Sequence, residues 1–306
     1  MFKSMIQNVP AAICGLALGT FTFSHILFQI HLAWLGLLAT TLGSICLVLF
    51  FIKLIRFPKA LGLELKDSNT FAIMPALPMG FMTLASILKS QFHINNLILT
   101  SFWIGAVLLH IILMIWFIVY FIIKHRTYPN TSWFVMFVGI GVIGETASSF
   151  YAKIGIFAID FSSVLFWILL AFILLERMWH YYPKDQLPMA VIISAPASLC
   201  LNAYLSYTES LSVSYILFYF VIAQFLFVFS VIFLPQIIEK RFKPAYAALT
   251  FPWAVTAAST YHLYTQLDLP GISQEMLGIL AMIEIIFAGC VIVWVYFRYT
   301  KHIFNT

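Results

Sequence analysis

Long apolar runs separated by short polar connections fill this chain from end to end. Each run is close to the roughly 20 residues that an α-helix needs to cross the hydrocarbon core of a membrane. Ten runs are predicted as membrane-spanning helices, at 8–28, 32–54, 70–88, 96–122, 133–152, 156–176, 189–207, 213–235, 245–264 and 274–297. The longest polar connection, residues 53–69, is shorter than one span. The pattern predicts a single transmembrane domain over residues 1–306.

The ten runs alternate between two classes. Odd-numbered runs contain internal prolines or glycine clusters, whereas the even-numbered runs have no internal proline, because Pro235 only marks the end of the eighth. A proline inside a membrane helix frees a carbonyl, which is tolerated where protein or a water-filled cavity meets the backbone. We therefore expect the odd runs to form an inner ring, with bends at Pro10, Pro75, Pro78, Pro196 and Pro252.

Short connections make each odd run an antiparallel neighbour of the even run that follows it. The fold predicted is an all-α integral membrane protein, with ten transmembrane helices arranged as five helical hairpins around a central pore. Small and polar residues of the odd runs are candidates for the pore lining: Gly15, Gly19, Gly141, Glu145, Ser194, Asn202, Ala247, Ala254 and Ala258. Close helix packing at small residues is the open alternative to a pore.

Composition and charge support a membrane location. The chain is 63% hydrophobic and 9% charged, with a mean hydropathy of +1.01, whereas soluble domains carry about 25% charged residues. If the N-terminus is cytoplasmic, all but Lys89 and Lys153 of the 16 lysines and arginines fall on the cytoplasmic side, Arg177 and Lys240 among them. This is the positive-inside distribution, and it predicts that both termini are cytoplasmic.

Other patterns exclude several classes of protein. The net charge of +5 is divided among short connections, so it does not indicate nucleic-acid binding. The four cysteines lie inside apolar runs without ligand spacing, which argues against a disulfide framework or a metal site. The first run is expected to stay as a span and not to be removed as a signal peptide. Trp179, Tyr181 and Tyr182 are predicted interfacial anchors.

Four stretches carry a resemblance to a known family: VPAAICGLALGTFTFSHI at 9–26, residues 56–86, PMAVIISAPASLCLNAYLS at 188–206, and residues 233–259. In order and spacing the chain resembles the tellurite-resistance and dicarboxylate transporter family, which includes bacterial TehA and the plant slow anion channels. The resemblance implies five hairpins around a pore, a homotrimer with one pore per subunit in the plasma or inner membrane, small inorganic or organic anions as substrates, and no cofactor.

The stretch TFPWAVTAAS at 250–259 places a bulky Phe251 beside Pro252 in an otherwise small-residue run. On its own, such a pair is a packing element of a membrane helix. In the family that the chain resembles, a phenylalanine of the ninth span occludes the pore, and Phe251 stands at that position. The resemblance therefore implies that Phe251 is a pore gate and that Pro252 bends the gate helix. A hydrophobic constriction of this kind stops ions by dewetting.

Glu145 lies in GIGVIGETASS within an odd run, where an ionisable residue is a functional candidate. A fixed negative charge would oppose anion conduction. Three interpretations are open: desolvation holds the carboxyl neutral, the carboxyl is paired or hydrogen-bonded away from the pore, or it couples proton movement to substrate.

Other polar residues of the spans have plainer interpretations. Ser194, Ser198 and Asn202 share one helical face and are either pore lining or contacts between helices. We expect His110 to bond a neighbouring helix, and Glu284 to bond a neighbouring helix or another subunit.

Two transport functions follow from these observations. One is a passive channel for small anions, gated by Phe251. The other is a proton-coupled carrier of C4-dicarboxylates, or an exporter of oxyanions such as sulfite or tellurite. The chain has no metal-ligand cluster and no paired nucleophile and base, so we do not expect an enzyme.

Overall fold

Helices account for all the regular structure in the computed structural model, which describes residues 2–92, 94, 96–175, 184–207, 212–239, 241–267 and 271–304. Arg177, Lys240 and the predicted interfacial anchors Trp179, Tyr181 and Tyr182 lie outside these residues. Within them, seven helical stretches are long and apolar enough to cross a membrane, and Ile13–Gln29 and Trp133–Ala147 are shorter apolar helices. The protein is thus a helical, multi-pass membrane protein, and the number of ten spans stays a prediction.

Five long helices expose most of their surface. They are α3 (Ala33–Arg56), α7 (Asn96–Phe117), which continues as a π-helix to Lys124, α10 (Ala152–Leu175), α12 (Val213–Ile232) and α15 (Ile272–Phe304). In the most apolar stretch of each, only 22% to 39% of the residues are buried. Exposed side chains such as Trp34, Ile112 and Phe225 show that these surfaces are hydrophobic, as expected where helices meet lipid.

Five other helices are largely buried. They are α2 (Ile13–Gln29), α6 (Ala76–Phe92), α9 (Gly141–Ala147), α11 (Ala195–Tyr207) and α14 (Thr250–Gln266), here called the inner helices. In the most apolar parts of the stretches 68–92 and 187–207, which contain α6 and α11, 78% and 89% of the residues are buried. These inner helices come from the odd-numbered runs of the sequence, so the difference in proline and glycine content corresponds to a difference in burial.

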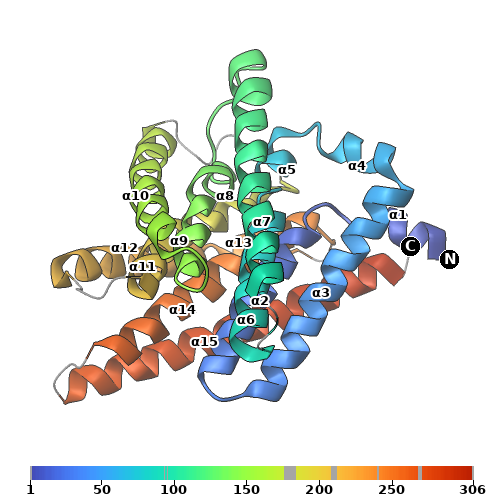
Figure 1. Ribbon diagram of the computed structural model, residues 1–306. Helices are drawn as coiled ribbons and strands as arrows, with labels where there is room; N and C mark the ends of the chain where they lie inside the picture. Colours follow the sequence, from blue (N-terminus) through green and yellow to red (C-terminus); the bar gives the residue numbers. More distant parts are fainter. Residues whose placement is uncertain are drawn as a thin grey trace.

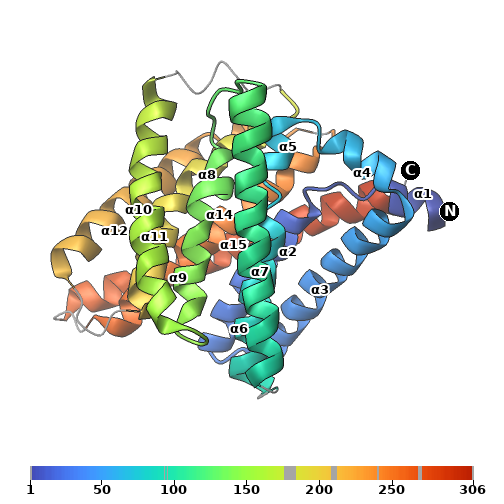
Figure 2. The same cartoon turned by 45° about the horizontal axis from the view of Figure 1, so that its top comes forward.

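Each inner helix packs against the exposed helix that follows it: α2 on α3, α6 on α7, α9 on α10, α11 on α12 and α14 on α15. The inner helices also contact one another in the closed order α2, α6, α9, α11, α14 and back to α2. Figures 1 and 2 show α7 and α10 on the outside of this group, and the two chain ends close together beside α1 (Phe2–Gln7).

A break in regular α-helix precedes every inner helix. The breaks are the turn at 8–12, the turn at 73–75, and the 3-10 segments η2 (Val138–Ile140), η4 (Leu187–Ser194) and η5 (Pro244–Leu249). Short helices flank some of them: α4 (Pro58–Glu64), α5 (Ser68–Ala72), α8 (Trp133–Phe137) and α13 (Leu234–Ile237).

The predicted proline bends lie at or just after these breaks. Pro10 and Pro75 lie in the turns, while Pro78, Pro196 and Pro252 lie in the first turns of α6, α11 and α14. Proline is tolerated in a first turn because its missing N–H has no intrahelical partner there.

A buried ion pair holds the break before α2. The Lys53 ammonium pairs with the Glu64 carboxylate and donates to the Val9 carbonyl at 2.5 Å. The other Glu64 oxygen accepts from the Ala11 N–H at 2.8 Å. The Lys53 side chain is 1% exposed, so its charge depends on Glu64 for neutralisation.

A chain of amides joins the breaks before three other inner helices. The Gln186 amide donates to Asp67 at 3.0 Å and accepts from Asn69 at 2.5 Å. Asn130 donates to Asn69 at 2.6 Å and accepts from the Ser132 backbone N–H at 3.0 Å. The segments before α6, α9 and α11 are thereby fixed to one another at one end of the molecule.

Removing the charge of Glu64 tests the role of the ion pair. We expect Glu64→Gln to lower the stability of the detergent-solubilised protein by about 2–3 kcal/mol, because Lys53 stays buried without a counter-charge. Lys53→Met together with Glu64→Gln should recover part of that loss. Lys59→Gln, at an exposed base of α4, is the control and should have little effect. Equal melting temperatures for Glu64→Gln and Lys59→Gln would show that the pair is not stabilising.

Candidate functional site

An apolar cavity of about 40 Å³ lies among the five inner helices and the breaks before them. The helices α2, α6, α11 and α14 contribute to its wall, and α9 is represented by α8 and the 3-10 segment before it. The lining residues are Ala12, Gly15, Leu18, Ile73, Ala76, Met79, Phe134, Val135, Val138, Gly139, Ile192, Ala195, Pro196, Leu199, Ala247, Ala248, Phe251 and Pro252. No side chain in this set is polar, and a cavity with such walls stays dry. A hydrated ion has neither the room nor the hydrogen-bond partners to pass.

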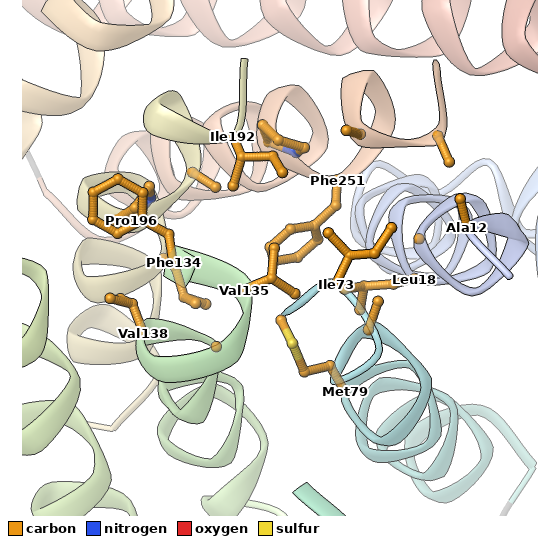
Figure 3. A pocket seen from close by; sticks show the side chains of 18 residues that line it. Ala12, Leu18, Ile73, Met79, Phe134, Val135, Val138, Ile192, Pro196 and Phe251 are labelled. Carbon is orange, nitrogen blue, oxygen red and sulfur yellow. The ribbon is translucent and has the colours of Figure 1, made fainter. Parts of the chain in front are cut away.

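Phe251 places its ring in the middle of this cavity. It is the second residue of α14, directly after the 3-10 segment η5. Figure 3 shows the ring pointing from α14 into the space between Val135, Ile73 and Leu18. The side chain is 7% exposed. The ring is therefore held among apolar neighbours from three other parts of the chain.

A larger, more polar cavity of about 420 Å³ adjoins the first and shares Ala12 and Ile73 with it. Its walls include Gln7 near the N-terminus and His302 near the C-terminus, so it lies at the end of the molecule where the two chain ends meet. Its carboxylates are Glu64, Asp67 and Asp185. The two cavities together trace a path from this end to Phe251.

The sequence matches the voltage-dependent anion channel (SLAC1) family over residues 8–299. The chain belongs to this family. No curated protein matches the sequence significantly. The match confirms the resemblance found in the sequence and makes the protein a member of an anion channel and transporter family.

Some of the predicted pore residues line a cavity, and others do not. Gly15, Pro196, Ala247, Phe251 and Pro252 line the apolar cavity, and Pro10 lines the larger one. The other candidates are absent from the wall of the apolar cavity: Gly19, Gly141, Glu145, Ser194, Asn202, Ala254 and Ala258.

Gly19 and Gly141 serve close contacts between helices. A Cβ added to Gly19 would lie 2.4 Å from Thr250 Oγ1 and 2.6 Å from the Phe251 backbone nitrogen. A Cβ at Gly141 would lie 3.1 Å from Ser162 Oγ and 3.2 Å from Leu199. Gly19 thus sets how near α2 comes to the first turn of α14, and therefore where Phe251 sits.

The small residues of α14 are also packed. Ala254 is fully buried. Ala258 packs with Ile26 and Ile285 in an apolar cluster that joins α14 to α2 and α15. Both positions bring helices together.

The polar residues of the α11 run contact neighbouring segments of the protein. The Ser194 hydroxyl donates to the Val191 carbonyl, and Ser198 bonds Thr256 of α14 at 2.8 Å. Asn202 is fully buried. It lies beside the carboxyl of Glu145, which is half-buried on α9.

His110 and Glu284 occupy helix interfaces. His110 is buried on α7, and its Nε2 bonds the Met136 carbonyl of α8 at 3.2 Å, which confirms the expected contact with a neighbouring helix. Glu284 is buried on α15, with its carboxyl beside Thr260 and Gln224.

The cavity wall also contains large apolar side chains, which the pattern of small residues in the odd runs does not predict. Ile73, Met79, Phe134 and Leu199 all lie in the wall. Spacing gives a partial signal, because Leu199 follows the lining residue Ala195 by four positions on one helical face. The turn and the short helix that position Ile73 and Phe134 have no such period.

Two glycines on the same face of α2 provide a matched test of the close approach to α14. We expect Gly19→Ala to destabilise the protein by about 1–3 kcal/mol, because its Cβ meets the α14 backbone and a helix has to move. Gly15→Ala meets only Ala247, at an ordinary 3.6 Å, and should be neutral or slightly stabilising. Thermal unfolding in detergent measures both. Equal shifts for the two variants would refute the distinction.

Proposed function

We propose that the protein conducts small anions passively along the axis of the five inner helices and that Phe251 closes this path. The observation that carries the proposal is the position of the Phe251 ring, in the middle of a wholly apolar cavity to which all five inner helices or their breaks contribute. Membership of the voltage-dependent anion channel family supports it. The five-hairpin arrangement of ten spans is part of this proposal, supported by the closed order of helix contacts.

The closed state follows from the chemistry of the wall. An ion entering the cavity loses its hydration shell, and the side chains of the wall offer only carbon and the sulfur of Met79 in return. A small rotation of one side chain changes the free cross-section and allows water to enter, which is how hydrophobic constrictions gate. Phe251 is suited to such a rotation because it follows directly on a break in the helix.

The assembly and setting are also proposed from family membership and charge. The protein is taken to be a homotrimer with one pathway per subunit in the plasma or inner membrane, with both termini cytoplasmic. The distribution of lysine and arginine supports that orientation, and the closeness of the chain ends agrees with termini on one side. We also propose that residues 1–306 form one transmembrane domain and that this domain transports its substrate without catalysing a reaction.

Truncating the gate should open the path. Phe251→Ala is expected to raise chloride and nitrate currents in planar bilayers by about tenfold or more, since removing only ~1.4 kcal/mol from a barrier has that effect. The matched control is Phe102→Ala on the exposed face of α7, where the phenylalanine is 39% exposed. Equal currents from Phe251→Ala and parent protein, at equal amounts in the bilayer, would rule out the gate.

A second candidate function is proton-coupled transport of dicarboxylates or oxyanions, and Glu145 is the observation that favours it. Its carboxyl lies on an inner helix beside Asn202. In the described part of the chain it forms no ion pair. A carboxyl so placed is able to take up and release a proton as a pathway opens and closes.

Proteoliposomes with an imposed pH gradient separate the two functions. For the channel, we expect chloride, nitrate and malate to stop at their own electrochemical equilibrium, and Glu145→Gln to behave as the parent protein. Accumulation of an anion beyond equilibrium, driven by the pH gradient and lost in Glu145→Gln, would instead establish the carrier. Glu275→Gln, at an exposed carboxylate of α15, controls for the loss of an acidic residue.

A further inference from the structure

Two histidines meet at the end of the inner group opposite to the chain termini. His25 lies near the end of α2 and His262 near the end of α14. Their rings are in edge contact, with centroids 6.4 Å apart. Both side chains are half-buried, whereas Ser24 and Ile26 on either side of His25 are fully buried. The His25 side chain is therefore partly accessible at a position flanked by fully buried residues.

Helical spacing places both histidines on the faces that line the cavity. On α2, Gly15 and Leu18 belong to the cavity wall, and positions 22, 25 and 29 continue that face at intervals of three or four residues. On α14, positions 255, 258 and 262 continue the face of Phe251 in the same way. His25 and His262 therefore continue these two helical faces beyond Phe251, past the packing of Ala258 with Ile26 and Ile285 and on the side away from the larger cavity.

Gln29 holds the His262 ring by a hydrogen bond, and one polar atom of each of these two side chains has no partner. Its amide lies 2.5 Å from Nε2 of His262 and bonds it there. The other amide atom of Gln29 and Nδ1 of His262 are buried without a partner. Buried polar atoms in a folded protein nearly always have partners, so these two atoms call for an occupant or a change of protonation. A half-turn of the Gln29 amide lets its oxygen accept from a protonated His262 Nε2 and frees the amide N–H groups to donate to an anion.

The charges near the pair do not supply a partner. In the described part of the chain, neither histidine forms an ion pair. The titratable groups that the turn between α2 and α3, the helices α6, α11, α12, α14 and α15, and the facing α9 bring to this end are His31, which is exposed, Lys89, Glu145, Tyr204, Tyr207, Tyr215, Tyr219, Tyr261, Tyr264, Glu275 and Glu284. Of the carboxylates, Glu275 is exposed, Glu284 is buried beside Thr260, and Glu145 lies beside Asn202.

We propose that His25 and His262, with Gln29, form a binding site for a small anion beyond the Phe251 constriction, and that the site fills when the histidines are protonated. A protonated imidazole presents two N–H donors and a positive charge, and a charge-assisted bond to an anion is about twice as strong as a neutral one. Since no fixed carboxylate pairs with the two rings, the mobile anion is the counter-charge. The site deepens the proposed function, because it would lie on the same conduction path.

Binding of nitrate to the detergent-solubilised protein tests the site without any need for transport. Apparent affinity is taken from the nitrate dependence of the melting temperature, with gluconate replacing nitrate at constant ionic strength. An anion that binds the protonated pair takes up protons as it binds, so its apparent affinity falls as the pH rises. We therefore expect nitrate to bind about tenfold more tightly at about pH 5.5 than at about pH 8. That factor corresponds to one charge-assisted hydrogen bond.

Histidine variants locate the effect. His25→Gln and His262→Gln should each weaken nitrate binding at the acidic pH, and the double variant should abolish its pH dependence. His110→Gln is the matched control, because His110, like His262, has one ring nitrogen without a partner, but it is fully buried between α7 and α8. If a variant folds poorly, the pH comparison on the unmodified protein and the other single variant still decide. Equal nitrate affinity at both pH values, or in parent and double variant, overturns the site.

The nitrate-binding test and the conduction test can fail independently of each other. If nitrate binds as expected but Phe251→Ala passes no anion current, the conduction proposal fails and the site stands. If Phe251→Ala conducts anions while nitrate binding shows neither pH dependence nor sensitivity to His25 and His262, the site fails and the conduction proposal stands.

Discussion

Backbone groups released at the breaks before the inner helices have to find hydrogen-bond partners within the protein, because lipid offers none. Side chains from other elements supply them. The Ala11 N–H is bound by Glu64, and the Met189 carbonyl accepts from the Thr131 hydroxyl at 2.7 Å. Each such bond joins two segments that are far apart in the sequence. The polar groups at this end of the molecule therefore fix the relative positions of the inner helices, and the exposed helices can remain regular and apolar.

The same breaks determine what fills the space between the inner helices. A 3-10 segment has fewer residues per turn than an α-helix, so its side chains do not continue the faces of the helix that follows. At the junction of η5 and α14 this change directs Phe251 into the cavity, while Thr250 beside it bonds the Gly15 carbonyl at 3.2 Å. The close contact at Gly19 holds α14 against α2. A constriction made of one ring and a packed backbone is the result.

Sequence reasoning succeeded where a pattern has one physical cause. Proline content separated the two classes of run because a released carbonyl is tolerated only away from lipid, and the burial of α6 and α11 agrees. It did not separate Gly15 from Gly19, which lie one turn apart on the same face. One lines the cavity and the other receives the α14 backbone, and the difference depends on where two helices cross. Hydropathy likewise could not show that residues 187–194 form a 3-10 segment, since an apolar run specifies burial and not helix type.

An apolar constriction cannot by itself distinguish an anion from a cation, because it offers no charge or dipole to either. Under the proposed function, selectivity has to arise from the electrostatic potential on each side of Phe251. At the end with the termini, the Lys53 charge is neutralised by Glu64. In the described residues of the five inner helices, Lys89 and Glu145 are the only permanently or readily charged side chains apart from His25 and His262. The larger cavity before Phe251 contains the carboxylates Glu64, Asp67 and Asp185, so proton uptake by the histidine pair would add positive charge on the opposite side of the constriction.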